Sequence, residues 1–213
     1  MADRPPRELP ERLARITGAV RGFMPPAEGA ALAHFASLVL APGTTGIEVG
    51  SYCGLSTIYL AHAAKSAGAT IVSVDHHRGS EENGPGWEHH DADLVDPLSG
   101  TLDTLYRFRR TLEVAGIADQ VVAVVADSAT AAAVLAPARL VFIDGGHGRE
   151  IAWRDYRSYA PKVEKDGLLL IHDVFEDPAL GGRPPWEIYR EALDSGDFAE
   201  IGHEGSLRAL RRL

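Results

Sequence analysis

The sequence is poor in the residues on which several kinds of protein depend. It has a single cysteine, Cys53, among 213 residues, so an internal disulfide framework and a multi-cysteine zinc site are both excluded. No run of residues is apolar enough for long enough to span a membrane. The first 18 residues also lack the apolar core of a signal peptide. These absences predict a soluble protein of the reducing cytoplasm.

Basic residues are also in deficit. The chain has 21 lysines and arginines against 30 aspartates and glutamates, which gives a formal net charge of −9. Nucleic-acid binding requires a basic face, and the cluster of Arg208 with Arg211 and Arg212 is too small to provide one. We therefore expect neither a nucleic-acid nor a membrane partner.

What the chain does have is an alternation of short apolar runs with longer segments of helical periodicity. With 45% hydrophobic and 24% charged residues, it has the composition of a globular domain with a sizeable core. The alternation predicts an α/β fold, with a mostly parallel central sheet and helices on both faces. The expected strands are 44–50, 69–75, 120–127, 139–146 and 167–173, and the expected helices between them are 55–66, 101–115 and 149–160.

Two further helical patterns, 8–20 and 27–40, precede this alternation. We interpret residues 1–42 as N-terminal helices of a single domain that covers residues 1–213. These helices are apolar, so they would pack on a second copy of the chain in a homodimer if they do not cover the chain's own sheet.

Two other segments differ from the strand and helix rhythm. Residues 184–213 predict a helix followed by an antiparallel hairpin around Gly205. Residues 76–98 are rich in histidine, acidic residues, glycine and proline. Long loops in compact domains are often functional, so we interpret residues 76–98 as an inserted lid loop.

The first strand ends in a glycine-bearing turn, with Glu48 inside the strand and Gly50 and Gly54 at the junction to the next helix. Glycines let the backbone approach a ligand, and the following helix offers free N–H groups. Tyr52 takes the place of the middle glycine in a dinucleotide-binding motif, so the spacing is incomplete. A tight turn without a ligand is the alternative.

Acidic residues close the other expected strands. Asp75 ends the second strand, about 25 residues after the glycine turn, where an acid can meet ribose hydroxyls. Asp127 and Ser128 follow the third strand, although either acid alone could cap a helix. Asp144 closes the fourth strand and His172-Asp173 the fifth, so these acids can converge at one edge of a parallel sheet and suit Mg²⁺.

Taken together, these strand ends resemble a class I S-adenosylmethionine-dependent methyltransferase with a Rossmann-like sheet, over roughly residues 44–175. The resemblance implies S-adenosylmethionine as cofactor. Its methionine part would contact Gly50, Ser51 and Gly54, its ribose Asp75, and its adenine Asp127 and Ser128. Glu48 belongs to the same implied cofactor-binding set.

The segments "IDGGH" and "GLLLIHD" resemble the metal-dependent sugar O-methyltransferases of the macrocin type. This resemblance implies that Asp144 and Asp173 hold Mg²⁺ or Mn²⁺, with His172 as a third ligand, and that His147 is the general base. The implied substrate is a small molecule or oligosaccharide, with a carbohydrate hydroxyl such as the 1-hydroxyl of a mannobiose precursor of methylmannose polysaccharide as acceptor. Alternatively, Asp144 caps the next helix and His147 is a surface residue.

The insert 76–98 then becomes the candidate substrate contact. We expect Trp87 to stack on a sugar ring, and His76 and Arg78 to donate hydrogen bonds to its hydroxyls. A zinc site in the insert is a competing reading, but its histidine pairs lack the i, i+4 spacing of a helical metal site. Two alternative functions stay open: O-methylation of a catechol or other phenol, and a non-catalytic S-adenosylmethionine-binding or hydroxylase-like relative.

Overall fold

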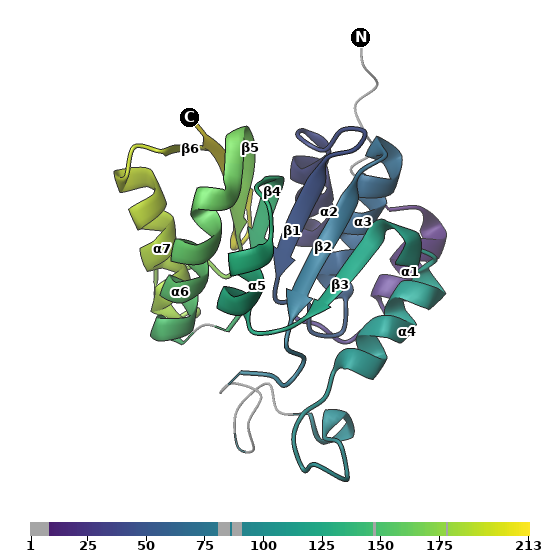
Figure 1. The fold of residues 1–213 in the computed structure, drawn as a ribbon. Helices are drawn as coiled ribbons and strands as arrows, with labels where there is room; N and C mark the ends of the chain where they lie inside the picture. The colour runs from purple at the N-terminus through teal and green to yellow at the C-terminus, as the bar shows by residue number, and fades with distance from the viewer. Residues whose placement is uncertain (1–8, 81–85, 87–90, 147, 178) are drawn as a thin grey trace.

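The computed structural model describes residues 9–80, 86, 91–146, 148–177 and 179–213. A seven-stranded sheet in the order β3-β2-β1-β4-β5-β7-β6 forms its centre (Figure 1). The strands are β1 (Thr45–Val49), β2 (Thr70–Asp75), β3 (Val121–Val125), β4 (Ala138–Ile143), β5 (Val163–Ile171), β6 (Phe198–Glu204) and β7 (Leu207–Arg212). β1 to β5 run parallel, and β6 and β7 form an antiparallel hairpin that pairs with β5 through β7. The predicted fold class and hairpin are confirmed.

Helices cover both faces of this sheet, as expected for buried parallel strands. On one face lie α1 (Glu11–Thr17), α2 (Pro26–Ser37), α3 (Leu55–Ala67) and α4 (Leu105–Ala115), and on the other lie α5 (Ser128–Val134), α6 (Arg149–Tyr159) and α7 (Arg183–Asp194). Side chains of β4 alternate between the two cores: Leu140 and Phe142 join the α2 and α3 side, and Val141 and Ile143 the α6 and α7 side. Short 3-10 helices are η2 (Ala92–Leu94), η3 (Ala118–Gln120) and η4 (Ala160–Lys162).

The N-terminal helices pack on their own chain. Leu32 and Phe35 of α2 are buried against β4, β5 and β7, and Leu13 of α1 is buried against α3 and α4. The reason for expecting a homodimer is therefore absent from the structure, and the homodimer stays a prediction. None of the helices in the described ranges is long and apolar enough to cross a membrane. The cytoplasmic location also stays a prediction.

Helices α5 and α4 differ from the expectations drawn from the sequence. Helix α5 was not expected, because its seven residues are too few to show a periodic pattern. The helix expected over 101–115 begins only at Leu105, because the residues before it pair with an earlier segment: Leu102 forms an antiparallel bridge with Val95, and the Asp103 N–H donates to the Leu94 carbonyl oxygen.

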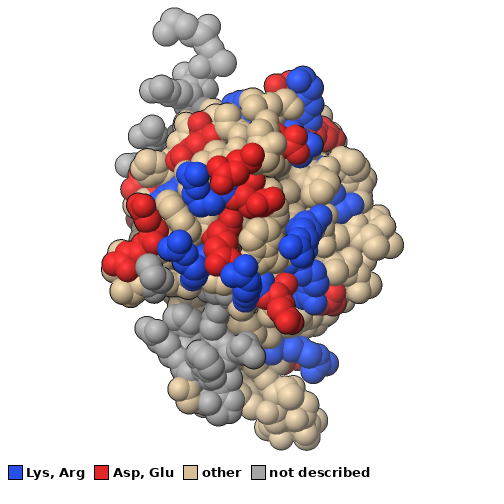
Figure 2. Space-filling model, turned by 90° about the vertical axis from the view of Figure 1, so that its left-hand side faces the viewer, with Lys and Arg blue, Asp and Glu red and all other residues tan. Residues whose placement is uncertain are grey.

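Charged side chains are mixed on the face that carries α6 and α7 (Figure 2). Ion pairs such as Arg149 with Glu187 and Arg190 with Asp194 lie on these helices. The absence of a nucleic-acid partner stays a prediction.

The order of strands locates the candidate site. From β1 the chain moves outward through β2 to β3, and then returns to β4 on the other side of β1. Open α/β sheets bind ligands at the carboxyl ends of the strands, where the order reverses in this way.

Candidate active site

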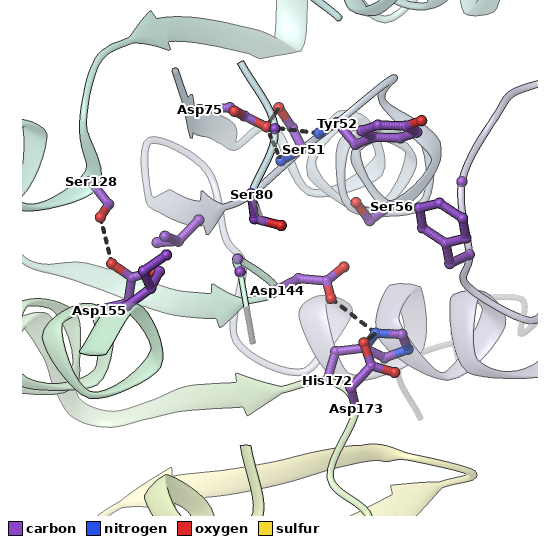
Figure 3. Close-up of a pocket in the computed structure, with 18 of the residues that line it drawn as sticks. Ser51, Tyr52, Ser56, Asp75, Ser80, Ser128, Asp144, Asp155, His172 and Asp173 are labelled. Atoms are coloured by element: carbon purple, nitrogen blue, oxygen red, sulfur yellow. Dashed lines mark hydrogen bonds and ion pairs between the residues drawn. The ribbon is translucent and has the colours of Figure 1, made fainter. Parts of the chain in front are cut away.

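A cavity of about 820 Å³ lies at the carboxyl edge of β1, β2, β4 and β5. Cavities of roughly 300–1,000 Å³ are typical of small-molecule and cofactor sites. Of the residues predicted from the sequence, the cavity is lined by Gly50, Ser51, Asp75, His76, Ser128, Asp144, His172 and Asp173. Figure 3 shows Asp144, His172 and Asp173 together on one side, and Ser128 with Asp155 on another.

The loop between β1 and α3 approaches the cavity through Gly50. Its φ is +86°, and a Cβ atom there would lie 2.3 Å from the backbone carbonyl oxygen of Asp144. Only glycine fits this position. Tyr52, in the place of the middle motif glycine, also has a positive φ of 48°, so the backbone keeps a glycine-like bend without the glycine.

Asp75 holds this loop in place. Its Oδ2 accepts hydrogen bonds from the N–H groups of Ser51 and Tyr52, at 2.9 and 2.8 Å (Figure 3). Its Oδ1 accepts one from the N–H of His77, at 2.6 Å. A carboxylate offers about four acceptor positions, so the described contacts leave Oδ1 one position for a hydroxyl. The ribose contact of Asp75 stays a prediction that this geometry supports.

Glu48 and Gly54 have other partners and are not among the described residues that line the cavity. The Glu48 carboxylate is fully buried and accepts hydrogen bonds from the hydroxyls of Ser56, Thr57 and Ser73, each at 2.7 Å. Burial raises the pKa of Glu48 to about 7, although the three hydroxyls favour the charged form. These bonds tie β1 to α3 and β2 beneath the cavity. A direct cofactor contact of Glu48 stays a prediction.

Gly54 lies where α3 meets α4. A Cβ atom there would come within 3.2 Å of the Phe108 and Thr111 side chains. The glycine therefore lets the two helices pack closely, and its predicted contact with the methionine part of the cofactor stays a prediction.

At the end of β3, Asp127 and Ser128 have different surroundings. Asp127 caps α5 by accepting hydrogen bonds from the N–H groups of Ala129 and Thr130, and it pairs with Arg154 at 3.1 Å. It does not belong to the described cavity lining, whereas Ser128 does. The contact of Asp127 with adenine stays a prediction.

Asp155 of α6 was not predicted from the sequence. It accepts a hydrogen bond from the Ser128 hydroxyl and lines the cavity, although only 2% of the residue is exposed (Figure 3). Burial raises the pKa of Asp155. A Cβ atom at Gly145 would lie 2.8 Å from its Oδ2, which explains why a glycine follows Asp144.

The acidic ends of β4 and β5 converge as predicted. β4 and β5 are paired up to Ile143 and Ile171, and the His172 N–H continues the pairing by donating to the Ile143 carbonyl oxygen. One ligand atom each from Asp144, His172 and Asp173 lie within 4.8 Å of one another. His172 Nδ1 is 2.9 Å from Asp144 Oδ1 and 3.3 Å from Asp173 Oδ2.

These distances fit a divalent cation. Adjacent ligands of an octahedral ion bound at about 2.1 Å are separated by roughly 3 Å. Burial disfavours the protonated form of His172, but the carboxylates of Asp144, Asp173 and Glu28 outweigh it and hold its pKa well above the ordinary value. This concentration of negative charge is the electrostatic setting that a cation neutralises.

Glu28 of α2 was also missed by sequence reasoning. It is 6% exposed, and its Oε2 lies 2.5 Å from His172 Nε2. Burial alone would raise the pKa of Glu28, but hydrogen bonds from His172 and Ser206 hold it below the ordinary value.

The predicted substrate residues are only partly described. His76 lines the cavity and is exposed, and its Nδ1 accepts a hydrogen bond from the Arg78 N–H. Arg78 is exposed and is not in the described lining. Trp87 and the predicted base His147 lie outside the described residues. The substrate roles of His76, Arg78 and Trp87 stay predictions.

The comparison with known families agrees with this geometry. Residues 47–174, more than half of the chain, match the family described as "Methyltransferase domain". The chain belongs to this methyltransferase family. The predicted enzyme class, an S-adenosylmethionine-dependent methyltransferase, is thereby confirmed. Membership of the macrocin-type subgroup stays a prediction.

Solved structures share the fold at low sequence identity. Cofactor-bound Rv0187 from MTB is 20% identical, with a TM-score of 0.60 over 93% of this chain and 86% of that one. An O-methyltransferase from Bacillus cereus in complex with SAH is 16% identical, with a TM-score of 0.62 over 95% and 89%. The SAH-bound methyltransferase PaMTH1 of Podospora anserina is 12% identical, with a TM-score of 0.66 over 96% and 89%.

Proposed function

We propose that this methyltransferase is a divalent-metal-dependent O-methyltransferase that methylates a carbohydrate hydroxyl, such as the 1-hydroxyl of a mannobiose precursor of methylmannose polysaccharide. The observation that carries the proposal is the group Asp144, His172 and Asp173 on the wall of the cavity that Gly50 and Asp75 also line. A cation-binding set and a cofactor-binding loop thus share one cavity.

The β1 side of the cavity suits S-adenosylmethionine, which would supply the methyl group. Gly50 brings the backbone to the cavity wall, and Asp75 has an acceptor position left for a ribose hydroxyl. Ser128 and Asp155 offer polar atoms elsewhere on the same wall. SAH, the product that S-adenosylmethionine leaves after methyl transfer, is bound in the Bacillus cereus O-methyltransferase, and this supports S-adenosylmethionine as the donor here.

The β4 and β5 side suits the acceptor. A divalent cation held by Asp144, Asp173 and His172 would lower the pKa of an acceptor hydroxyl near it. His147 follows Asp144 by three residues, and a histidine with a pKa of about 6.5 can accept the hydroxyl proton near neutral pH. Asp144 and Asp173 orient the acceptor, which lowers the barrier to displacement at the methyl carbon.

A carbohydrate acceptor is supported by the polar start of the insert, where exposed His76 lines the cavity. A second candidate acceptor is a catechol or other phenol. The observation that favours it is an aromatic pair on the cavity wall, Phe23 and Tyr52, whose ring centroids are 5.5 Å apart and of which Phe23 is 56% exposed.

The test is transfer of labelled methyl from S-adenosylmethionine to short mannosides, other sugars and catechols, with Mg²⁺, with Mn²⁺ and with EDTA. Asp144→Asn and Asp173→Asn are compared with Asp194→Asn, a control at the exposed end of α7. We expect labelled sugar that is lost with EDTA and in both site variants but not in the control. Transfer that persists in EDTA would contradict the metal dependence. Label on catechols alone would contradict the carbohydrate acceptor and favour a phenol.

A further inference from the structure

Glu28 connects the candidate metal group to two distant parts of the chain. Its Oε2 faces His172 Nε2 at 2.5 Å, and its Oε1 accepts a hydrogen bond from the Ser206 N–H at 2.7 Å. The Ser206 hydroxyl also donates to Oε2, at 3.1 Å. All three residues are buried, with 4 to 6% of each exposed. Both carboxylate oxygens therefore act as acceptors.

The two nitrogens of His172 face different groups. Nε2 faces Glu28, whereas Nδ1 faces Asp144 and Asp173. A neutral imidazole has one N–H group and one lone pair. Carboxylates that only accept face both nitrogens, so a cation between the two aspartates would take the Nδ1 lone pair, and the remaining proton would lie on Nε2, where Glu28 accepts it.

We infer that Glu28 is a positioning residue that fixes His172 as an Nδ1 ligand of the divalent cation. The inference rests on the metal site of the proposed function. Histidine ligands commonly donate their other N–H to a carboxylate, which sets the tautomer and the ring orientation, and loss of that partner typically weakens metal binding about 10- to 100-fold.

The turn of the C-terminal hairpin keeps Glu28 in place. A Cβ atom at Gly205 would lie 2.0 Å from Glu28 Oε1. The Ser206 carbonyl oxygen accepts a hydrogen bond from the Val174 N–H, at 3.0 Å, one residue after Asp173. The turn thus contacts both the supporting carboxylate and the strand end that carries the ligands.

The experiment measures Mn²⁺ affinity from the signal of free Mn²⁺ in electron paramagnetic resonance, on the full chain without substrate. Glu28→Gln keeps the shape but leaves only one acceptor oxygen for His172 and Ser206. Glu28→Asp keeps the charge but shortens the reach. Glu200→Gln, in the same hairpin and bonded to the Tyr189 hydroxyl, is the control for loss of a carboxylate.

We expect Mn²⁺ affinity to fall about 10- to 100-fold in both Glu28 variants and to stay unchanged in Glu200→Gln. Unchanged affinity in Glu28→Asp would mean that only charge matters and would overturn the inference. Unchanged Mn²⁺ affinity in both Glu28 variants would also overturn the inference, because Glu28 would then have only a structural role. If the wild type does not bind Mn²⁺, the metal dependence of the proposed function fails and the inference with it.

A second measurement needs no variant. Nitrogen-15 spectra of the Mg²⁺-loaded wild type report which nitrogen of His172 carries the proton. A proton on Nε2 and none on Nδ1 supports the inference. A proton on Nδ1 overturns it, and this result stands even if the Glu28 variants fail to fold.

Discussion

The Nε2 atom of His172 lies 2.5 Å from the Oε2 atom of Glu28, a residue 144 positions earlier in the chain. Ser206, which donates two hydrogen bonds to Glu28, belongs to the C-terminal hairpin. Both Glu28 and Ser206 lie outside the matched methyltransferase region, 47–174. The segments that flank the matched region therefore supply the residues that contact His172 of the candidate metal group and hold its partner in place.

The first prediction concerns Gly205, whose φ is +52°. Gly205→Ala should destabilise the protein by about 1 to 3 kcal/mol more than Gly196→Ala, because its new Cβ meets Glu28. Gly196 has a similar backbone, with φ of +75°, but no atom within 4 Å of a Cβ. Urea unfolding measures the difference. Equal losses in the two variants would show that the turn can move away from Glu28.

The strand ends of the site were predictable because β1, β2 and β4 are largely buried on both faces. Each strand then appears as an apolar run that ends at a polar residue, as at Asp75 and Asp144. The convergence of Asp144 with His172 and Asp173 follows from the pairing of β4 with β5. The apolar pattern along each strand and the adjacency of the strands were sufficient to predict these site residues.

Glu28 and Asp155 escaped prediction because they lie on helices. The sequence does carry a signal: Glu28 shares a face with Leu32 and Phe35 at i+4 and i+7, and Asp155 lies on the buried face of α6 beside Tyr156. An acid on an apolar helix face needs a buried partner. Periodicity identifies such an acid but does not reveal its partner.

The second prediction concerns Gly50. Gly50→Ala should weaken SAH binding at least about tenfold, because the atom that its Cβ meets is the backbone carbonyl of Asp144, which cannot rotate away. Gly43→Ala is the matched control, with φ of +76° and nothing within 4 Å of the Cβ. Isothermal titration calorimetry with SAH measures both. Normal affinity in Gly50→Ala would place the cofactor away from this loop.

The third prediction concerns His147. His147→Ala should lower methyl transfer by about 10² to 10⁴-fold, the usual contribution of a general base, while SAH affinity stays near normal. His203→Ala, at an exposed position in β6, is the control. Turnover and SAH affinity are measured on the same preparations. Unchanged turnover would remove His147 from the role of base.

The last prediction concerns pH and Glu48, whose pKa in the folded protein is about 7 against an ordinary value of 4.5. A raised pKa means that the fold favours the protonated form. The contribution of Glu48 to the free energy of unfolding is therefore complete below about pH 4.5 and is lost as the pH rises through 7, by about 2 to 3 kcal/mol between pH 5 and 8.

Glu48→Gln stays neutral, so the variant should lack this part of the fall in stability. Urea unfolding of both proteins at pH 5 and pH 8 isolates it, because every other titrating group is common to the two. SAH affinity should not change, since the Glu48 carboxylate bonds to the hydroxyls of Ser56, Thr57 and Ser73. Parallel stability curves would mean that Glu48 is already charged at pH 5, and weaker SAH binding would restore the cofactor contact implied by its motif.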